Sequence, residues 1–98
     1  MTNKLEYYEV SASSYFVEGT PEDVLFEGLA SESGEVLAER IKELRPDRAG
    51  TDNTEAILEE LSDVLWYINQ IAINRGSSLY AIVQRGIIKL YDRQINGK

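Results

Sequence analysis

Hydrophobic residues recur along this chain every three to four positions, and no segment alternates apolar and polar residues in the manner of a strand. This spacing predicts an all-α fold with four helices, which we expect to pack as a helical bundle in one domain spanning residues 1–98. The first expected helix has the weakest pattern, and Ser77 or Ser78 is expected to cap the last. The expected helices cover residues 4–16, residues 21 to about 44, a stretch from the start at 52–55 to about 74, and a stretch from Ser77 or Ser78 to about 93.

Residues that start and stop helices fix the boundaries. Thr20 is expected to cap the second helix, with Pro21 at its first position. A loop follows at residues 45–51, where proline, glycine and charged residues gather. Asp52–Glu55 has the spacing of a capping box and predicts the start of the third helix. Gly76 is expected to end it.

Acidic residues accompany the apolar faces of the two long helices. At about 100° per residue, Glu32 falls among the apolar residues of the first long helix, and Glu35 and Glu39 lie at the edge of that face. On the next helix Glu60 borders the apolar face, and Asp63 lies one step further round. The apolar residues themselves are Leu25, Leu29 and Val36 on the first, and Ile57, Leu61, Val64, Leu65, Ile68, Ile71 and Ala72 on the second.

Four carboxylates therefore converge if the two helices pack antiparallel. Residues at i and i+3 are neighbours on a helix, so Glu32 and Glu35 form one pair and Glu60 and Asp63 another. Like charges at a packing seam repel, and a hard divalent cation such as Mg²⁺ prefers such oxygen ligands. The alternative is that these acids are surface residues in ordinary salt bridges, for example Glu35 or Glu39 with Arg40 or Lys42.

Other positions also allow two interpretations. Gly28 and Gly34 lie inside an expected helix, which favours either the close approach of a helix or ligand or simple tight packing. Lys89 and Arg93 share a helix face and suit phosphate oxygens, but they also suit the negative end of a helix dipole. Trp66 lies opposite the apolar stripe of its helix, so we expect it to pack on a second surface, either in a subunit interface or against a base. A helix that is apolar on two sides favours burial in an oligomer.

Composition removes several classes of function. The 98 residues include no cysteine and no histidine, which excludes thiolate chemistry, disulfides and catalysis by histidine. The net charge of −7 argues against binding to a nucleic-acid polymer. No apolar run has the length of a membrane span, and the polar start does not resemble a signal peptide, so we expect a cytoplasmic protein without membrane contact.

Three segments together resemble the MazG-like nucleotide pyrophosphohydrolases. Residues 28–36 (GLASESGEV) are similar to the GL-x-x-E-x-GE-V segment of that family, and residues 57–67 (ILEELSDVLWY) to its E-L-x-D-V-L-W-Y segment. Residues 89–93 (KLYDR) resemble the K-L-x-x-R that closes its small members. The resemblance covers roughly residues 20–97. One departure is Gly86, where small members often carry asparagine, and it bears on substrate choice.

The resemblance implies an all-α enzyme that cleaves a (d)NTP to the monophosphate and pyrophosphate. By analogy Glu32, Glu35, Glu60 and Asp63 hold Mg²⁺ and form the catalytic centre. Lys89 and Arg93 match basic positions that approach the phosphates. The family also implies a homodimer or homotetramer whose helices complete the bundle. The general base stays open between a glutamate and water activated by the metal. The alternative function is a non-catalytic acidic helical oligomer that senses nucleotides or binds another protein.

Overall fold

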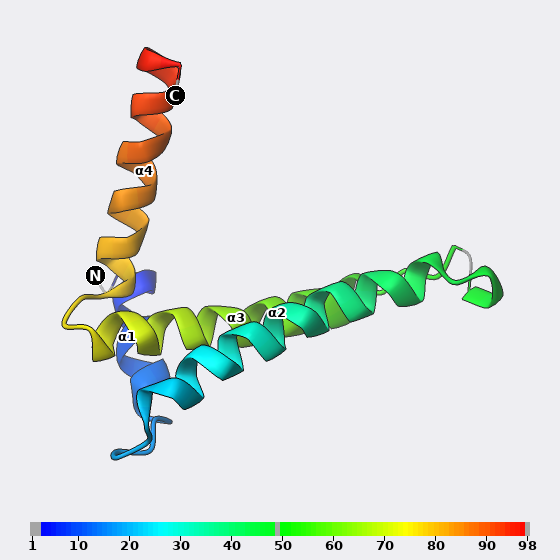
Figure 1. Ribbon diagram of the computed structural model, residues 1–98, viewed down its shortest axis with the longest axis horizontal. Coiled ribbons are helices and arrows are strands. Elements are labelled where there is room, and N and C mark those ends of the chain that lie inside the picture. The colour runs from blue at the N-terminus through cyan, green and yellow to red at the C-terminus, as the bar shows by residue number, and fades with distance from the viewer. Residues whose placement is uncertain (1–2, 49, 98) are drawn as a thin grey trace. The chain divides into compact units, whose positions relative to one another are not determined.

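The computed structural model describes residues 3–48 and 50–97, and these residues form α-helices and one short 3₁₀ helix, with no strand among them (Figure 1). The all-α prediction is therefore confirmed, with four α-helices. No helix in the described part of the chain is long and apolar enough to cross a membrane. The elements are α1 (Lys4–Ser13), α2 (Glu22–Leu44), η1 (Pro46–Arg48), α3 (Thr54–Asn74) and α4 (Leu79–Asn96).

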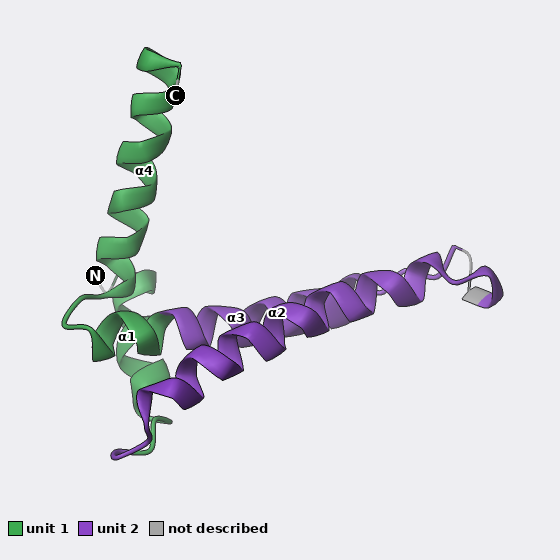
Figure 2. Cartoon of the chain, viewed as in Figure 1, with its two compact units in different colours: residues 1–17, 69–98 green, residues 18–68 purple. Residues whose placement is uncertain are grey.

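The chain divides into two compact units, and the boundary falls inside α3 (Figure 2). Unit 1 comprises residues 1–17 and 69–98, and unit 2 comprises residues 18–68. Unit 2 holds α2 and most of α3, and unit 1 holds α1, the end of α3 and α4. The single domain expected for residues 1–98 stays a prediction.

Unit 2 is a hairpin of two helices. α2 begins one residue later than predicted, because Pro21 occupies the cap position and Glu22 is the first helical residue. The prediction that Thr20 caps α2 is therefore wrong, because the cap position falls one residue later, at Pro21. The ring of proline fixes its φ angle, and its side chain has no atom that can accept a hydrogen bond from the first turn. The negative charges of Glu22 and Asp23 in that turn interact favourably with the positive end of the helix dipole.

The closed end of the hairpin is held by carboxylates of α2. The Asn53 backbone N–H donates to Glu43 Oε2 at 2.7 Å, and Asn53 Nδ2 donates to the Glu39 backbone oxygen and to Glu39 Oε2, both at 3.2 Å. The bond from Asn53, followed by that from Arg40, lowers the pKa of Glu43. These bonds tie the start of α3 back onto the last turns of α2.

The predicted capping box at Asp52–Glu55 takes a different form. α3 begins at Thr54, and the Asp52 carboxylate accepts a bond from the Thr54 backbone N–H at 2.9 Å, two residues along the chain. This is an Asx turn. Bonds from the Thr54 hydroxyl and then from its N–H lower the pKa of Asp52. The helix begins within the predicted segment. The Asp52 carboxylate, however, accepts from the N–H of Thr54, two residues along, and a capping box requires the N–H three residues along.

In unit 1, α1 contacts α4, and one bond between them has a carboxylate of α1 as its acceptor. Glu9 Oε1 accepts from the Tyr80 backbone N–H at 3.0 Å, in the first turn of α4. The Ser78 hydroxyl accepts from the Ala81 N–H and caps α4, as predicted, and Gly76 with φ +74° follows the end of α3. α1 is three residues shorter than predicted and α4 extends three residues further, to Asn96.

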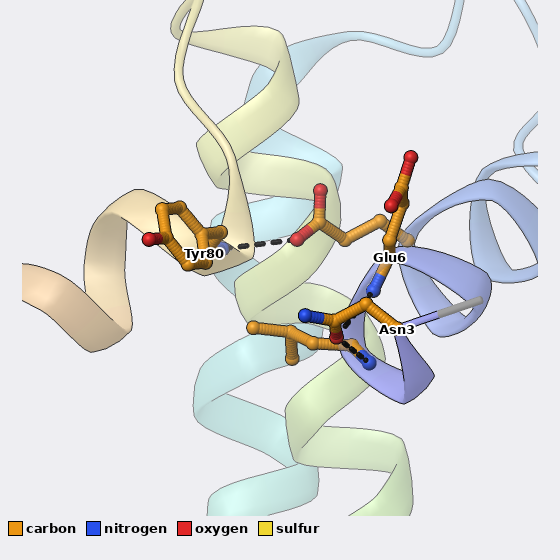
Figure 3. Close-up of a pocket in the computed structure, with 5 residues that line it drawn as sticks. Asn3, Glu6 and Tyr80 are labelled. Atoms are coloured by element: carbon orange, nitrogen blue, oxygen red, sulfur yellow. Dashed lines mark hydrogen bonds between the residues drawn. The ribbon is translucent and has the colours of Figure 1, made fainter. Parts of the chain in front are cut away.

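A shallow hollow of about 390 Å³ lies beside this α1–α4 contact (Figure 3). None of its lining residues is one of the predicted site residues. They are Asn3, Leu5, Glu6, Glu9 and Tyr80.

The buried apolar core is small, and the predicted packed face of α3 is covered only in part. Leu25 is 2% exposed, whereas Leu61 is 45% exposed and Leu65 is 38% exposed, although both leucines were placed on the packed face of α3. Ile57, Val64, Ile68 and Ile71 of that face are half-buried and Ala72 is buried, so the prediction is wrong for the two leucines only. The side that α3 turns toward α2 also carries Glu60 and Tyr67.

Candidate metal centre

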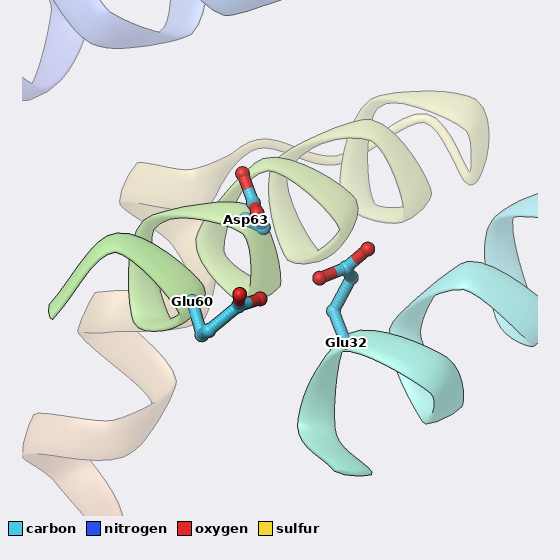
Figure 4. Close-up of side chains that lie close together, drawn as sticks. All are labelled: Glu32, Glu60 and Asp63. Carbon is cyan, nitrogen blue, oxygen red and sulfur yellow. The ribbon is translucent and has the colours of Figure 1, made fainter. Parts of the chain in front are cut away.

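Three carboxylates converge between the two helices of unit 2. Glu32 extends from α2 toward Glu60 on α3, and Asp63 lies next to Glu60 on the same helix (Figure 4). One carboxylate oxygen from each residue lies within 4.8 Å of the other two. Glu32 and Glu60 are half-buried and Asp63 is exposed. The antiparallel hairpin thus brings together three of the four predicted site acids.

The fourth acid, Glu35, does not belong to this group. Its side chain is exposed on α2 and is not among the three convergent carboxylates. Its charge still reaches the cluster, because it is one of the charges that raise the pKa of Glu60. Glu35 therefore lies beside the carboxylate trio rather than within it.

The surroundings of Glu60 change the pKa of this one carboxyl group. The pKa of Glu60 is raised, first because its carboxylate loses solvent and next because it shares a hydrogen bond with Glu32. The negative charges of Glu32, Asp63 and Glu35 act in the same direction. In the chain alone, a proton bound at Glu60 relieves this repulsion, and a cation bound at the cluster would do the same.

The trio lacks cationic partners, in contrast to the acids near the closed end of the hairpin. Glu39 pairs with Lys42 Nζ at 2.8 Å, and Glu43 pairs with Arg40 Nη1 at 2.9 Å. Within the described residues, no lysine or arginine forms an ion pair with any of the three convergent carboxylates or with Glu35. The salt-bridge interpretation thus holds for Glu39, but it does not account for the trio.

The donor set suits a hard divalent cation. All three ligand atoms are carboxylate oxygens, which magnesium and calcium prefer, and the chain has no histidine or cysteine to favour softer metals. Opposite oxygen ligands of magnesium lie roughly 4.2 Å apart, twice the ~2.1 Å metal–oxygen distance. Three ligands cannot all be opposite one another, and neighbouring ligands lie roughly 3.0 Å apart. The three oxygens, within 4.8 Å of one another, would therefore have to move closer together to hold the ion.

One turn from the trio, the two helices are in close contact. A Cβ atom placed on Gly28 would lie 2.8 Å from Tyr67 Oη and closer still to ring atoms Cε1 and Cζ. A side chain of α3 thus approaches Gly28 closely, which fits both interpretations of this glycine. For Gly34 nothing lies within 4 Å of the corresponding position. The half-buried Trp66 packs edge-on against Tyr67, with ring centroids 5.0 Å apart.

The predicted phosphate-binding residues belong to the other unit. Lys89 and Arg93 are exposed on α4, one turn apart, in unit 1. Gly86, the departure from the family pattern, has open space around it. The phosphate-binding role of Lys89 and Arg93 stays a prediction.

The sequence pattern did not indicate two buried amides at the end of α3. Asn69 is fully buried and Gln70 is 4% exposed, and the side-chain amide of Asn69 and Nε2 of Gln70 have no hydrogen-bond partner. Buried amides of this kind lower stability, because they lose water without gaining a bond. Periodicity could not find them, since polar residues are ordinarily expected on the outside of a helix.

Comparison with known proteins gives one relative. The chain is 34% identical over 73 residues to the gene 37 protein of Mycobacterium phage L5, and the match covers 71% of this chain and 63% of the phage protein. The match thus spans less than two thirds of that relative's length. No protein-family model matches the chain. No solved structure matches it.

Proposed function

We propose that this chain is a magnesium-dependent nucleoside triphosphate pyrophosphohydrolase of the MazG-like type, which cleaves a (d)NTP to the monophosphate and pyrophosphate. The observation that carries the proposal is the trio of Glu32, Glu60 and Asp63, which converge from two helices without a cationic partner in the described chain. The resemblance of three segments to that family supplies the substrate class. A cytoplasmic location is part of the same proposal.

The trio would hold the metal through its carboxylate oxygens. When bound, magnesium neutralises phosphate charge, orients the triphosphate for in-line attack and increases the acidity of water. The oxygen of the attacking water bonds to the α phosphorus, and the bridging oxygen leaves with pyrophosphate. Lys89 and Arg93 are proposed to bind phosphate oxygens and stabilise the charge of the leaving group.

Glu35 is the carboxylate that we assign to proton transfer from the attacking water. It lies near enough to affect Glu60 and is outside the trio, so metal binding would leave it free to accept a proton. Glu35→Gln should then retain Mn²⁺ affinity and lose turnover. A loss of Mn²⁺ affinity in this variant would instead place Glu35 among the metal ligands.

A second copy of the chain is the proposed partner, in a dimer or tetramer. Unit 2 leaves apolar side chains exposed on both helices of the hairpin, and two packed helices bury too little surface to be stable alone. On α2, the exposed residues Phe26, Leu37 and Leu44 fall within roughly 20° of one another around the helix axis. The exposed large side chains of α3 in this unit are Leu58, Leu61 and Leu65.

In unit 1, α4 also carries exposed apolar side chains. Its exposed residues Tyr80, Val83, Ile87 and Leu90 follow the 3–4–3 spacing of a coiled-coil seam. An isolated helix of 18 residues is marginal in water, so α4 requires a covering surface. A second α4 with the same seam provides one.

The test of the proposed activity is pyrophosphate release from a panel of canonical and modified (d)NTPs, with magnesium and with chelator. Glu60→Gln removes one charge of the trio, and Glu59→Gln is the matched control, because Glu59 is the exposed neighbour on the same helix. We expect magnesium-dependent release by the wild type and by Glu59→Gln, and none by Glu60→Gln.

The non-catalytic alternative predicts a different outcome in the same assay. A folded wild-type chain that releases no pyrophosphate from any substrate contradicts the proposed enzyme. A nucleotide sensor would still bind a triphosphate without turnover, and a protein-interaction module would bind neither metal nor nucleotide. Binding measured by calorimetry separates these two.

A further inference from the structure

We infer that Tyr67, seated on the bare backbone of Gly28, is a positioning residue that sets the helix separation and register at which the carboxylate trio forms. The inference rests on the proposed function, because it assigns these two residues a role at the proposed metal centre. The sequence suggested only that Gly28 permits a close approach, and it did not identify what approaches.

The register follows from the numbering of the two contacts. Glu32 lies four residues after Gly28 on α2, and Asp63 lies four residues before Tyr67 on the antiparallel α3. Residues four apart share a helix face. The Gly28–Tyr67 contact and the approach of Glu32 to Asp63 are therefore adjacent layers of the same interface, about one turn apart.

The separation follows from the size of the two side chains. A phenol ring is a large group to place between two helices, and it fits here because Gly28 has no Cβ. The ring is held from a second side by Trp66, which packs edge-on against it. A smaller residue at position 67 or a larger one at position 28 would change the distance between the helices, and with it the reach of Glu32 toward Glu60 and Asp63.

Gly34 provides an internal control. It lies in the same helix but roughly 200° round the axis from Glu32, and a Cβ added there meets nothing within 4 Å. Gly28→Ala and Gly34→Ala thus make the same chemical change with the same gain in helix propensity. They differ in the contact with Tyr67.

The test measures Mn²⁺ affinity by electron paramagnetic resonance and the near-UV circular dichroism of Trp66, which is the one tryptophan of the chain. We expect Gly28→Ala to change the Trp66 signal and to weaken Mn²⁺ binding by about tenfold or more, as found for residues that orient metal ligands. Gly34→Ala should change neither. The double variant Gly28→Ala/Tyr67→Leu should recover part of the affinity, because the shorter side chain relieves the clash.

The outcomes separate this inference from the proposed function. Equal Mn²⁺ affinity in Gly28→Ala and the wild type overturns the positioning role and leaves the metal centre intact. A weakened affinity that the double variant fails to improve also overturns it, because the effect would then not pass through the Tyr67 ring. Absence of Mn²⁺ binding in the folded wild type rejects the metal centre itself, and the positioning role with it.

Discussion

Asn53 offers a sharp test of how the hairpin is closed. Its Nδ2 donates at 3.2 Å to both the backbone oxygen and the carboxylate of Glu39, in a partly buried position. Both bonds are at the long end of the normal range, and one has a charged acceptor. We therefore expect Asn53→Ala to lower the free energy of unfolding by about 1–2 kcal/mol.

A second substitution, Asn53→Asp, should change the free energy of unfolding in a direction that depends on which group donates the hydrogen bond. Aspartate is ordinarily as good a helix cap as asparagine, so Asn53→Asp would be nearly neutral if the side chain only capped α3. Because Asn53 instead donates to Glu39, Asn53→Asp places two carboxylates together and should destabilise the chain more than Asn53→Ala at neutral pH. The difference should shrink as the pH falls toward about 4, where carboxylates take up protons.

Thermal unfolding followed by far-UV circular dichroism, at one fixed protein concentration, measures both variants. A loss of 1–2 kcal/mol corresponds to a fall in Tm of roughly 5–15 °C for a chain of this size. An Asn53→Asp variant as stable as the wild type would refute the proposed direction of these hydrogen bonds. A change of less than about 0.5 kcal/mol in Asn53→Ala would show that they contribute no more than an ordinary surface contact.

Three further predictions concern pH, burial and assembly. The pKa of Glu60 is raised in the folded state, so its stabilising contribution is present below the ordinary carboxyl pKa and is lost as pH rises through the raised value. The urea midpoints of the metal-free chain should therefore fall across that pH window, and Mg²⁺ should restore them. Glu60→Gln should abolish this pH dependence. Asn69→Leu removes a buried amide without partners and should raise Tm by a few degrees, corresponding to about 1 kcal/mol; a lower Tm would show that the amide has a partner. Ile87→Lys should shift the chain toward a smaller species in sedimentation, whereas Asp92→Lys on the opposite side of α4 should not; equal behaviour of the two would contradict the α4 seam.

Local signals in the sequence predicted the elements well. Periodicity, Ser78 and Gly76 gave the four helices and the end of α3, because caps and stops depend on a few neighbouring residues. The start of α2 moved by one residue, because Pro21 can itself occupy the cap position. A shift of one residue in a helix start changes only the first turn, and the alternative starts differ little in free energy.

Contacts between helices were harder to predict. The acidic pairs suggested that four carboxylates would meet, but the register set by Gly28 and Tyr67 brings together three and leaves Glu35 aside. Leu61 and Leu65 are exposed although the periodicity placed them on the packed face of α3, whereas the other five apolar residues of that face are half-buried or buried. Periodicity reports which faces are apolar, and it does not report which apolar face meets which partner.

Hydrolysis of a (d)NTP by the wild-type chain in ¹⁸O-labelled water, with magnesium and product analysis by mass spectrometry, tests the central claim most directly. Attack at the α phosphorus predicts one ¹⁸O atom in the monophosphate, unlabelled pyrophosphate, and no products from Glu60→Gln. Labelled pyrophosphate, release of diphosphate and phosphate, or undiminished turnover by Glu60→Gln would contradict it.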